Sequence, residues 1–239
     1  MKRIIPVLII SALLVITGCD FEKNPVTQNT KTNEQMYELA IQDAMVAEES
    51  EISKNLIAIT PTNNYLSWSN GYVLVVTWTK YSSSYPVSDT ISTWWGETWV
   101  TVVPEMKDFY KRNKYSREKL TVRTEQLLGL PNNSGNTYFV EMWVKPEDLL
   151  RPAYDNEVTD NTCGLSFPET TSDEYILWFN NTIISSYYPN LQNAKHPWTR
   201  LGYTYDWGNP TCEIGLSEFI IKKNAEVIVK SVQATFDYI

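Results

Sequence analysis

Hydrophobic positions along the chain repeat with two periods, one typical of β-strands and one typical of α-helices. The clearest strand pattern is YVLVVTWT at 72–79, in which alternate side chains would lie on opposite faces. Asn70-Gly71 precedes it directly, between β-rich flanks, and is a strong signal for a tight turn. We therefore predict a β-hairpin around residues 70 and 71.

The remaining elements follow from similar local signals. Predicted helices have a capping residue or a proline at their start, or a glycine at their end. Strands are predicted where short apolar runs end at turn residues. Helices are expected at 33–50 (capping box Thr32 and Gln35), 105–112 (after Pro104), 120–128 (before Gly129) and 172–187 (capped by Ser172), with one helical turn at 146–150; strands are expected at 55–60, 99–103 and 138–144, with a final hairpin turning near Lys223-Asn224 and irregular structure at 151–171.

These elements indicate an α+β fold. Strands and helices alternate without a strict βαβ rhythm, and two hairpins are predicted. We therefore expect a single globular domain over 33–239, with a mainly antiparallel sheet and packed helices.

The chain begins with a different pattern. Lys2 and Arg3 precede about 14 largely apolar residues, which is the layout of a secretory signal. As a helix this run would span roughly 20 Å, less than the ~30 Å hydrocarbon core of a bilayer. A cleaved signal is therefore favoured over a transmembrane anchor.

The end of the apolar run, Ile16-Thr17-Gly18-Cys19, resembles the lipobox of bacterial lipoproteins. This resemblance implies removal of residues 1–18, acylation of Cys19 and anchoring to a membrane, with the domain outside the cytoplasm. Two or three acyl chains hold a protein at a bilayer where one chain does not. The polar segment that follows, up to residue 32, is expected to be a disordered tether. A plain secretory signal without lipidation remains the alternative.

Charge narrows the choice of partners. Residues 1–18 contain Lys2 and Arg3 and no acidic residue, so without them the chain keeps 18 Lys and Arg against 28 Asp and Glu, a net charge of −10. Such a surface repels phosphate backbones and anionic headgroups. We expect no nucleic-acid partner, and we expect contact with the bilayer to come from the lipid.

Two cysteines remain beyond Cys19, and in an exported protein they are most simply interpreted as one disulfide, Cys163–Cys212. Two free buried thiols are the alternative. With one His and no CxxC motif, a metal site on these cysteines is disfavoured.

The acidic run 155–160 offers oxygen ligands but lacks the EF-hand glycine and glutamate, so a solvated loop is expected there. No cofactor is predicted.

The loop 196–209 concentrates aromatic and charged residues, including His196, the only histidine. Aromatic platforms beside an arginine and a carboxylate suit a glycan or a peptide end. The alternative is that the aromatics pack against the sheet, with Arg200 and Asp206 paired. No nucleophile motif accompanies His196, so a Ser-His-Asp triad is not supported. The predicted ligand-binding residues are Trp198, Arg200, Tyr203, Tyr205, Asp206 and Trp207.

Carboxylates define a competing, enzymatic hypothesis. Glu141 shares a predicted strand face with Phe139 and Trp143, and a carboxyl group buried among aromatics has the raised pKa that a general acid needs. The segment beginning Glu218-Phe219-Ile220-Ile221, with its returning strand 225–229, resembles the catalytic hairpin of ADP-ribosyltransferases, which would make Glu218 the catalytic glutamate. The Arg-bearing strand and the Ser-Thr-Ser strand of that family are not found.

Two functions therefore remain in competition. The favoured one is a non-enzymatic envelope lipoprotein that binds a glycan or peptide. The other is an envelope hydrolase or transferase that uses Glu141, Asp206 or Glu218. A carboxylate inside a cleft beside the aromatic loop would favour catalysis, and a flat aromatic shelf would favour binding. A purely structural envelope spacer, the third possibility, predicts neither.

Overall fold

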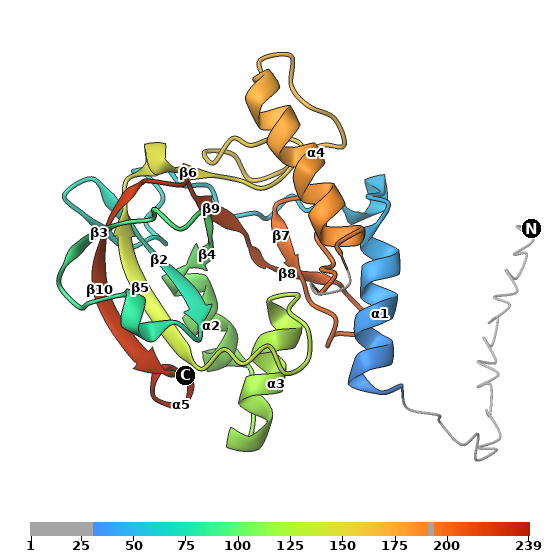
Figure 1. The fold of residues 1–239 in the computed structure, drawn as a ribbon, viewed down its shortest axis with the longest axis horizontal. Helices are drawn as coiled ribbons and strands as arrows, with labels where there is room; N and C mark the ends of the chain where they lie inside the picture. The colour runs from blue at the N-terminus through green and yellow to red at the C-terminus, as the bar shows by residue number, and fades with distance from the viewer. Residues whose placement is uncertain (1–30, 191–193) are drawn as a thin grey trace, which may run out of the picture. The chain divides into compact units, whose positions relative to one another are not determined.

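An antiparallel sheet of eight strands is the largest element of the computed structural model, which describes residues 31–190 and 194–239 (Figure 1). Residues 31–239 form one compact unit. The predicted α+β class with a mainly antiparallel sheet is confirmed. The predicted signal peptide, Cys19 and all but the last two residues of the predicted tether lie outside the described residues.

The strands of the large sheet follow the order β3-β10-β5-β2-β4-β9-β6, with β1 added beside β2. A second sheet pairs β7 with β8. Their bounds are β1 Trp68–Ser69, β2 Tyr72–Thr79, β3 Thr90–Ser92, β4 Thr98–Val102, β5 Tyr138–Val144, β6 Leu149–Leu150, β7 Tyr203–Tyr205, β8 Ile214–Ser217, β9 Phe219–Ile221 and β10 Glu226–Ala234.

The predicted C-terminal hairpin is wrong, although its turn exists. Asn224 adopts a left-handed conformation (φ 64°), as a tight turn requires. However, β9 pairs with β4 and β6, whereas β10 pairs with β3 and β5. In a flat sheet these positions would lie about 19 Å apart. The four residues between the strands span at most about 18 Å when fully extended, so the sheet must curl.

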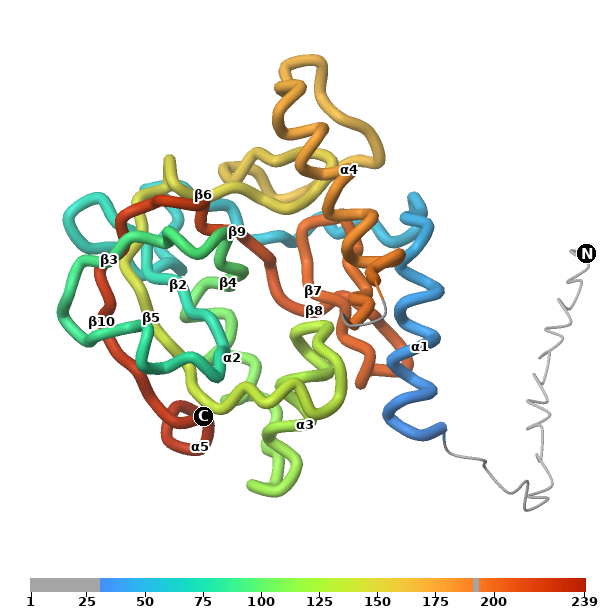
Figure 2. Tube along the Cα trace, in the orientation of Figure 1, coloured from blue at the N-terminus to red at the C-terminus, as the bar shows by residue number. Residues whose placement is uncertain are grey.

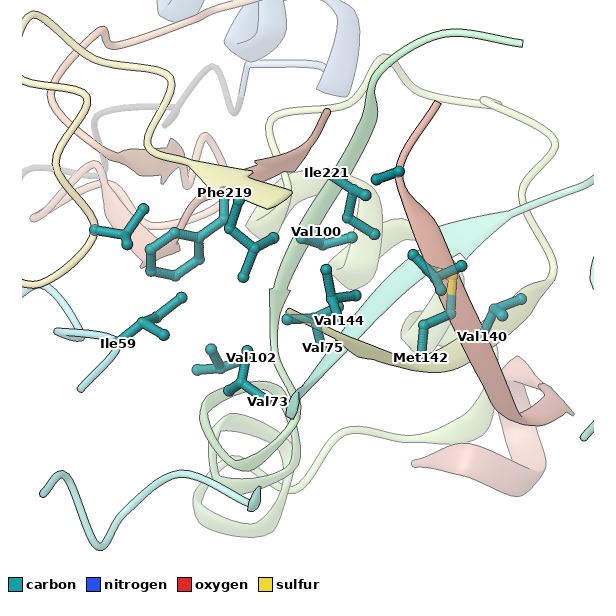
Figure 3. Packing of buried hydrophobic residues seen from close by; sticks show 14 of the residues in the cluster. Ile59, Val73, Val75, Val100, Val102, Val140, Met142, Val144, Phe219 and Ile221 are labelled. Carbon is teal, nitrogen blue, oxygen red and sulfur yellow. The ribbon is translucent and has the colours of Figure 1, made fainter. Parts of the chain in front are cut away.

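Curling gives the sheet two different apolar faces. The inner face is filled by side chains from the strands themselves, among them Val75, Val102, Met142 and Phe219 (Figure 3). On the outer face, Leu74, Val76 and Phe139 pack with residues of α2 (Val103–Arg112), α3 (Arg117–Leu127) and the short α5 (Thr235–Tyr238). Because β2 and β5 contribute side chains to both faces, their sequences are nearly continuous apolar runs.

The remaining helices form a separate group beside the sheet (Figure 2). Helix α1 (Asn33–Ala44) starts with the predicted capping box, and Ser172 caps α4 (Asp173–Tyr187) as predicted. The two helices meet where the Tyr187 hydroxyl donates to the Ala44 carbonyl. Helix α1 ends before residue 50, where the prediction placed its end. Glutamates are unfavourable at the negative end of a helix dipole, and residues 49–51 form a separate 3₁₀ turn, η1 (Glu49–Glu51).

Most local signals produced the expected element. Asn70 and Gly71 both have positive φ between β1 and β2, and Gly129 (φ 63°) follows the C-cap of α3. Pro104 lies in the first turn of α2, and strand β5 has the predicted bounds. The short 3₁₀ helices η2 (Ser82–Ser84) and η3 (Pro146–Asp148) complete the set, the latter at the predicted helical turn.

The predicted strand at 55–60 is not formed. Its backbone groups bond to the acidic loop and to side chains instead of to a neighbouring strand. The Ile59 N–H donates to the Val158 carbonyl at 2.7 Å, and the Ile57 N–H donates to the Ser217 hydroxyl at 2.8 Å. The Arg151 side chain, fully buried, donates to the carbonyls of Glu157 and Asp160 and holds the acidic loop in place.

The predicted Cys163–Cys212 disulfide is absent, because both thiols are free. Cys163 is buried, and its sulfur accepts from the Asp155 N–H at 3.4 Å. Burial raises the pKa of this thiol to about 11. Cys212 is exposed at the turn that connects β7 and β8. One cysteine is thus held in the interior and the other lies at the surface.

This arrangement predicts two thiols of very different reactivity. In a Cys19→Ser chain, Ellman's reagent should modify Cys212 within minutes, because it is exposed. Cys163 should react only in guanidinium chloride, because its thiolate is disfavoured and inaccessible. Peptide mapping of the labelled chain identifies each site. A Cys19→Ser chain that shows no reactive thiol even when unfolded without reductant would contain the disulfide.

Candidate functional site

A pocket of about 710 Å³ lies against the outer face of the sheet. One side is lined by residues of β2 and β4, including Val76, Trp78 and Thr101, and the other by residues of α4, the segment 194–198 and β7. In Figure 1 these two groups of elements lie at the left and the right of the domain. The volume is within the range of cavities that take small molecules.

Five tryptophans line this pocket, from four separate parts of the chain. Trp198 is buried, and its ring packs edge-on against Trp99 of β4 (centroids 6.2 Å) and against Trp178 of α4 (6.0 Å). The Trp198 indole N–H donates to the Pro152 carbonyl at 2.9 Å. Trp95 and Trp99 remain more than one-third exposed. The pocket therefore offers large aromatic surfaces, some of them accessible. The five are Trp78, Trp95, Trp99, Trp178 and Trp198.

Hydroxyl side chains form the second component of the lining. Several of them have already donated their hydrogen inside the protein. Thr204 donates to the Leu127 carbonyl at 2.6 Å, and Thr182 donates to the Trp178 carbonyl at 2.9 Å. An oxygen that donates in this way keeps its lone pairs as acceptors. The serine and threonine residues of the lining are Thr77, Thr79, Thr98, Thr101, Thr182, Ser185, Ser186 and Thr204.

Glu218 lies in this pocket, between the end of β8 and the start of β9. Its backbone is fixed, because its N–H donates to the Gly202 carbonyl at 2.9 Å and the neighbouring Ser217 N–H donates to the Glu105 carboxylate at 2.9 Å. Its carboxyl group has no hydrogen bond or ion pair with any side chain in the described ranges. Burial raises the pKa of Glu218 to about 8, so this carboxyl group is mostly protonated at neutral pH.

Among the described residues of the lining, His196 is the only one whose side chain could carry a positive charge. Its backbone N–H donates to the Ser186 carbonyl, and its Nδ1 lies 3.5 Å from the Tyr37 hydroxyl. Burial lowers the pKa of His196 below its ordinary value of 6.5. The imidazole is therefore neutral at neutral pH.

The structure separates the predicted ligand-binding residues into two groups. Trp198 and Tyr205 line the pocket, and the Tyr205 hydroxyl donates to Asp43 at 2.7 Å. Arg200, Tyr203 and Trp207 are buried and do not line the pocket; they bond to the backbone carbonyls of Ala44, Glu51 and Leu130, respectively.

Asp206 is also buried, and its partner is Arg123 of α3, not Arg200. The guanidinium and the carboxylate form two parallel hydrogen bonds, one of them 2.7 Å between Nη1 and Oδ1. Such a bidentate pair is strong and directional. Asp206 therefore ties β7 and the residues after it to α3 and has no place in the pocket.

The expectation of a raised pKa for Glu141 is wrong. Burial of its carboxylate raises the pKa, but ion pairs with Lys107 (2.6 Å) and Lys230 (2.9 Å) outweigh it, and the net shift is downward. Glu141 is ionised and lies outside the pocket lining. The resemblance of Glu218 to a catalytic hairpin glutamate also lacks support, because β9 and β10 do not form a hairpin.

Residue type alone could not reveal the pocket. Trp95 and Trp99 stand out in the sequence TWWGETWV, but Trp178 lies almost eighty residues later in a helix. Only the fold brings them together, because both pack against Trp198. Within the described parts of the chain, no group of three or more His, Cys, Asp or Glu side chains is arranged to hold a metal ion.

Comparison of the chain with protein-family models, with curated proteins and with solved structures finds no match. Over residues 31–190 and 194–239, no helix has the length and apolar character needed to cross a bilayer.

The raised pKa of Glu218 predicts a pH-dependent stability. The unfolded chain releases the proton near the ordinary value of 4.5, whereas the folded chain keeps it to about 8. The free energy of unfolding therefore falls by about 1.4 kcal/mol per pH unit between these values. Urea unfolding at about pH 5 and about pH 8.5 should show a smaller fall for Glu218→Gln than for the unchanged chain. Glu105, whose pKa is also raised, is present in both chains and cancels. Equal falls in both chains would mean that Glu218 is ionised in the folded state.

Proposed function

We propose that this chain is a bacterial cell-envelope lipoprotein, anchored through Cys19, whose domain binds a glycan in the pocket beside α4. The observation that carries the proposal is the combination of five tryptophans with eight serine and threonine side chains in one cavity. Tryptophan faces stack on the apolar faces of sugar rings, and hydroxyl groups pair with sugar hydroxyls. This composition favours a glycan over a peptide.

The exposed rings support a binding role. Trp99 and Trp95 are 38% and 37% exposed although they are large apolar groups, so a ligand can cover them. Their positions are held by neighbouring groups. The Trp95 indole N–H donates to the Thr98 hydroxyl at 3.2 Å, and Trp99 packs edge-on against Trp198. A preorganised aromatic surface loses little entropy when it binds.

The second candidate function is glycoside hydrolysis, and one observation favours it. A protonated Glu218 beside aromatic walls has the character of a general acid. A glycosidase also needs a second carboxylate, and Glu97 is the other acidic side chain of the lining. Glu97 is exposed and belongs to the connection between β3 and β4. Detection of released sugars distinguishes this function from binding.

The binding proposal predicts that Trp99 contributes directly. The chain should co-sediment with purified cell-wall sacculi or bind members of a panel of envelope glycans. Trp99→Ala should weaken this binding about tenfold or more, since the variant loses an exposed aromatic face. Trp94→Ala is a matched control, because Trp94 is a neighbouring tryptophan, 71% exposed, that does not line the pocket.

Mass analysis of the supernatant completes the experiment. Retention without new products, reduced by Trp99→Ala but not by Trp94→Ala, supports binding. New soluble fragments that disappear with Glu218→Gln would establish hydrolysis instead. Equal retention of both tryptophan variants would show that the pocket is not the binding site.

The anchor makes a separate prediction. In a bacterial host, the chain should incorporate an alkyne analogue of palmitate and fractionate with membranes. Cys19→Ala should abolish both, because the acceptor thiol is lost. The domain should remain folded, since Cys19 lies outside the compact unit 31–239. A Cys19→Ala chain that is still labelled and still in the membrane fraction would exclude lipidation at this residue.

A further inference from the structure

The charges that face the pocket are unbalanced. Its described lining contains two carboxyl side chains, Glu218 and Glu97, and no Lys or Arg. His196 is held neutral by burial. The lysines and arginines that form ion pairs do so elsewhere, at the buried carboxylates of Glu141 and Asp206 and at the partly exposed Asp160. A positive group that pairs with Glu218 must therefore come from the ligand.

The hydrogen-bonding groups of the pocket point to the same conclusion. Thr101, Thr182, Ser185 and Thr204 each donate their hydroxyl hydrogen to another group of the protein. Their oxygens retain acceptor capacity, and an ionised Glu218 accepts only. These four hydroxyls therefore offer a ligand acceptors and not donors. An ammonium group brings three donors and no acceptor.

Tryptophan faces provide a third, independent attraction. A cation over an indole ring is stabilised by the ring quadrupole, more strongly when water is excluded. Over the described residues, the chain's own cations lie over other rings, such as Arg123 over Phe109 and Lys230 over Trp143. None lies over Trp95, Trp99, Trp178 or Trp198. Of these four rings, Trp95 and Trp99 are exposed enough to take a cation of the ligand.

We infer that the glycan bound here carries a free amino group, and that Glu218 is the residue that pairs with the resulting ammonium. The inference rests on the proposed glycan-binding function and specifies its ligand class as N-unacetylated hexosamines. A buried carboxyl group without a partner is costly to ionise, and an ammonium within hydrogen-bond distance removes that cost. On binding, Glu218 releases its proton to the solvent and the ion pair forms.

N-acetylation of the sugar distinguishes an ion pair between Glu218 and an ammonium group from a hydrogen bond between Glu218 and an acetamide group. An acetamide has no charge, so it cannot form the ion pair. A protonated Glu218 could instead donate a hydrogen bond to the acetamide carbonyl, and the pocket would then prefer the acetylated sugar. The two pairings thus predict opposite preferences for two ligands that differ only at the amine.

Calorimetric titration of the full chain in non-ionic detergent tests the inference. The probes are oligomers of glucosamine and of N-acetylglucosamine of equal length, at a slightly acidic pH. The unacetylated oligomer should bind about tenfold tighter or more, as expected for one additional charge-assisted contact. Glu218→Gln should reduce this preference to less than about threefold. Glu97→Gln, the control at the exposed carboxylate, should retain it.

Proton release provides a readout that needs no variant. At this slightly acidic pH the amine of the free oligomer is already an ammonium, so binding should release the proton of Glu218, detected as a dependence of the binding enthalpy on the buffer. His196, Tyr85, Tyr205 and Glu97 are the other titratable groups of the lining, and Tyr187 lies close enough to Glu218 for their charges to interact. The acetylated oligomer contacts the same groups without a charge and therefore controls for them.

The possible outcomes distinguish failure of the inferred ligand class from failure of the proposed glycan-binding function. Equal or tighter binding of the acetylated oligomer, or binding of the unacetylated one without proton release, overturns the inference and leaves glycan binding intact. Failure of both oligomers to bind, together with retention on sacculi that depends on Trp99, overturns the ligand class alone. Failure of both oligomers and no retention on sacculi overturns the proposed function as well.

Discussion

The connection between β9 and β10 constrains the entire domain. It contains four residues, yet it joins two strands that have β5, β2 and β4 between them in the sheet. Only a curled sheet can meet both requirements. The curl encloses an inner core made mainly by the strands and presents an outer face to the helices. It also places the start of β9, and therefore Glu218, on the side of the sheet that lines the pocket.

A small number of polar contacts holds the second wall of the pocket against that face. The Arg123–Asp206 pair links α3 to the residues after β7, and Glu105 of α2 accepts hydrogen bonds from Ser217 at the end of β8. Breaking a buried ion pair leaves an uncompensated charge and costs about 3–5 kcal/mol. The wall is therefore held firmly by groups that take no part in lining the cavity. The sequence hypothesis gave Asp206 a binding role, whereas its position makes it a support for the site.

Local signals allowed most elements to be predicted, and long-range packing explains the errors. The capping box at Thr32, the turn at Asn70-Gly71 and the cap at Ser172 each act within a few residues, so the sequence reveals them. The partners of β9 and β10 depend on curvature, which no short segment encodes. The charge state of Glu141 depends on Lys107 and Lys230, which lie on other elements. The predicted binding residues Trp198 and Tyr205 line the pocket, whereas Trp99 and Trp178 join them only in the folded chain.

The grouping of tryptophans also has an optical consequence. The Trp198 ring centroid lies 6.2 Å from that of Trp99 and 6.0 Å from that of Trp178, and Trp95 belongs to the same lining. Indole emission responds to the polarity around the ring, and neighbouring indoles exchange excitation energy. A molecule that enters this cavity displaces water from several coupled indoles simultaneously. The intrinsic fluorescence of the unlabelled protein is therefore weighted toward the pocket and can report its occupancy without an added dye.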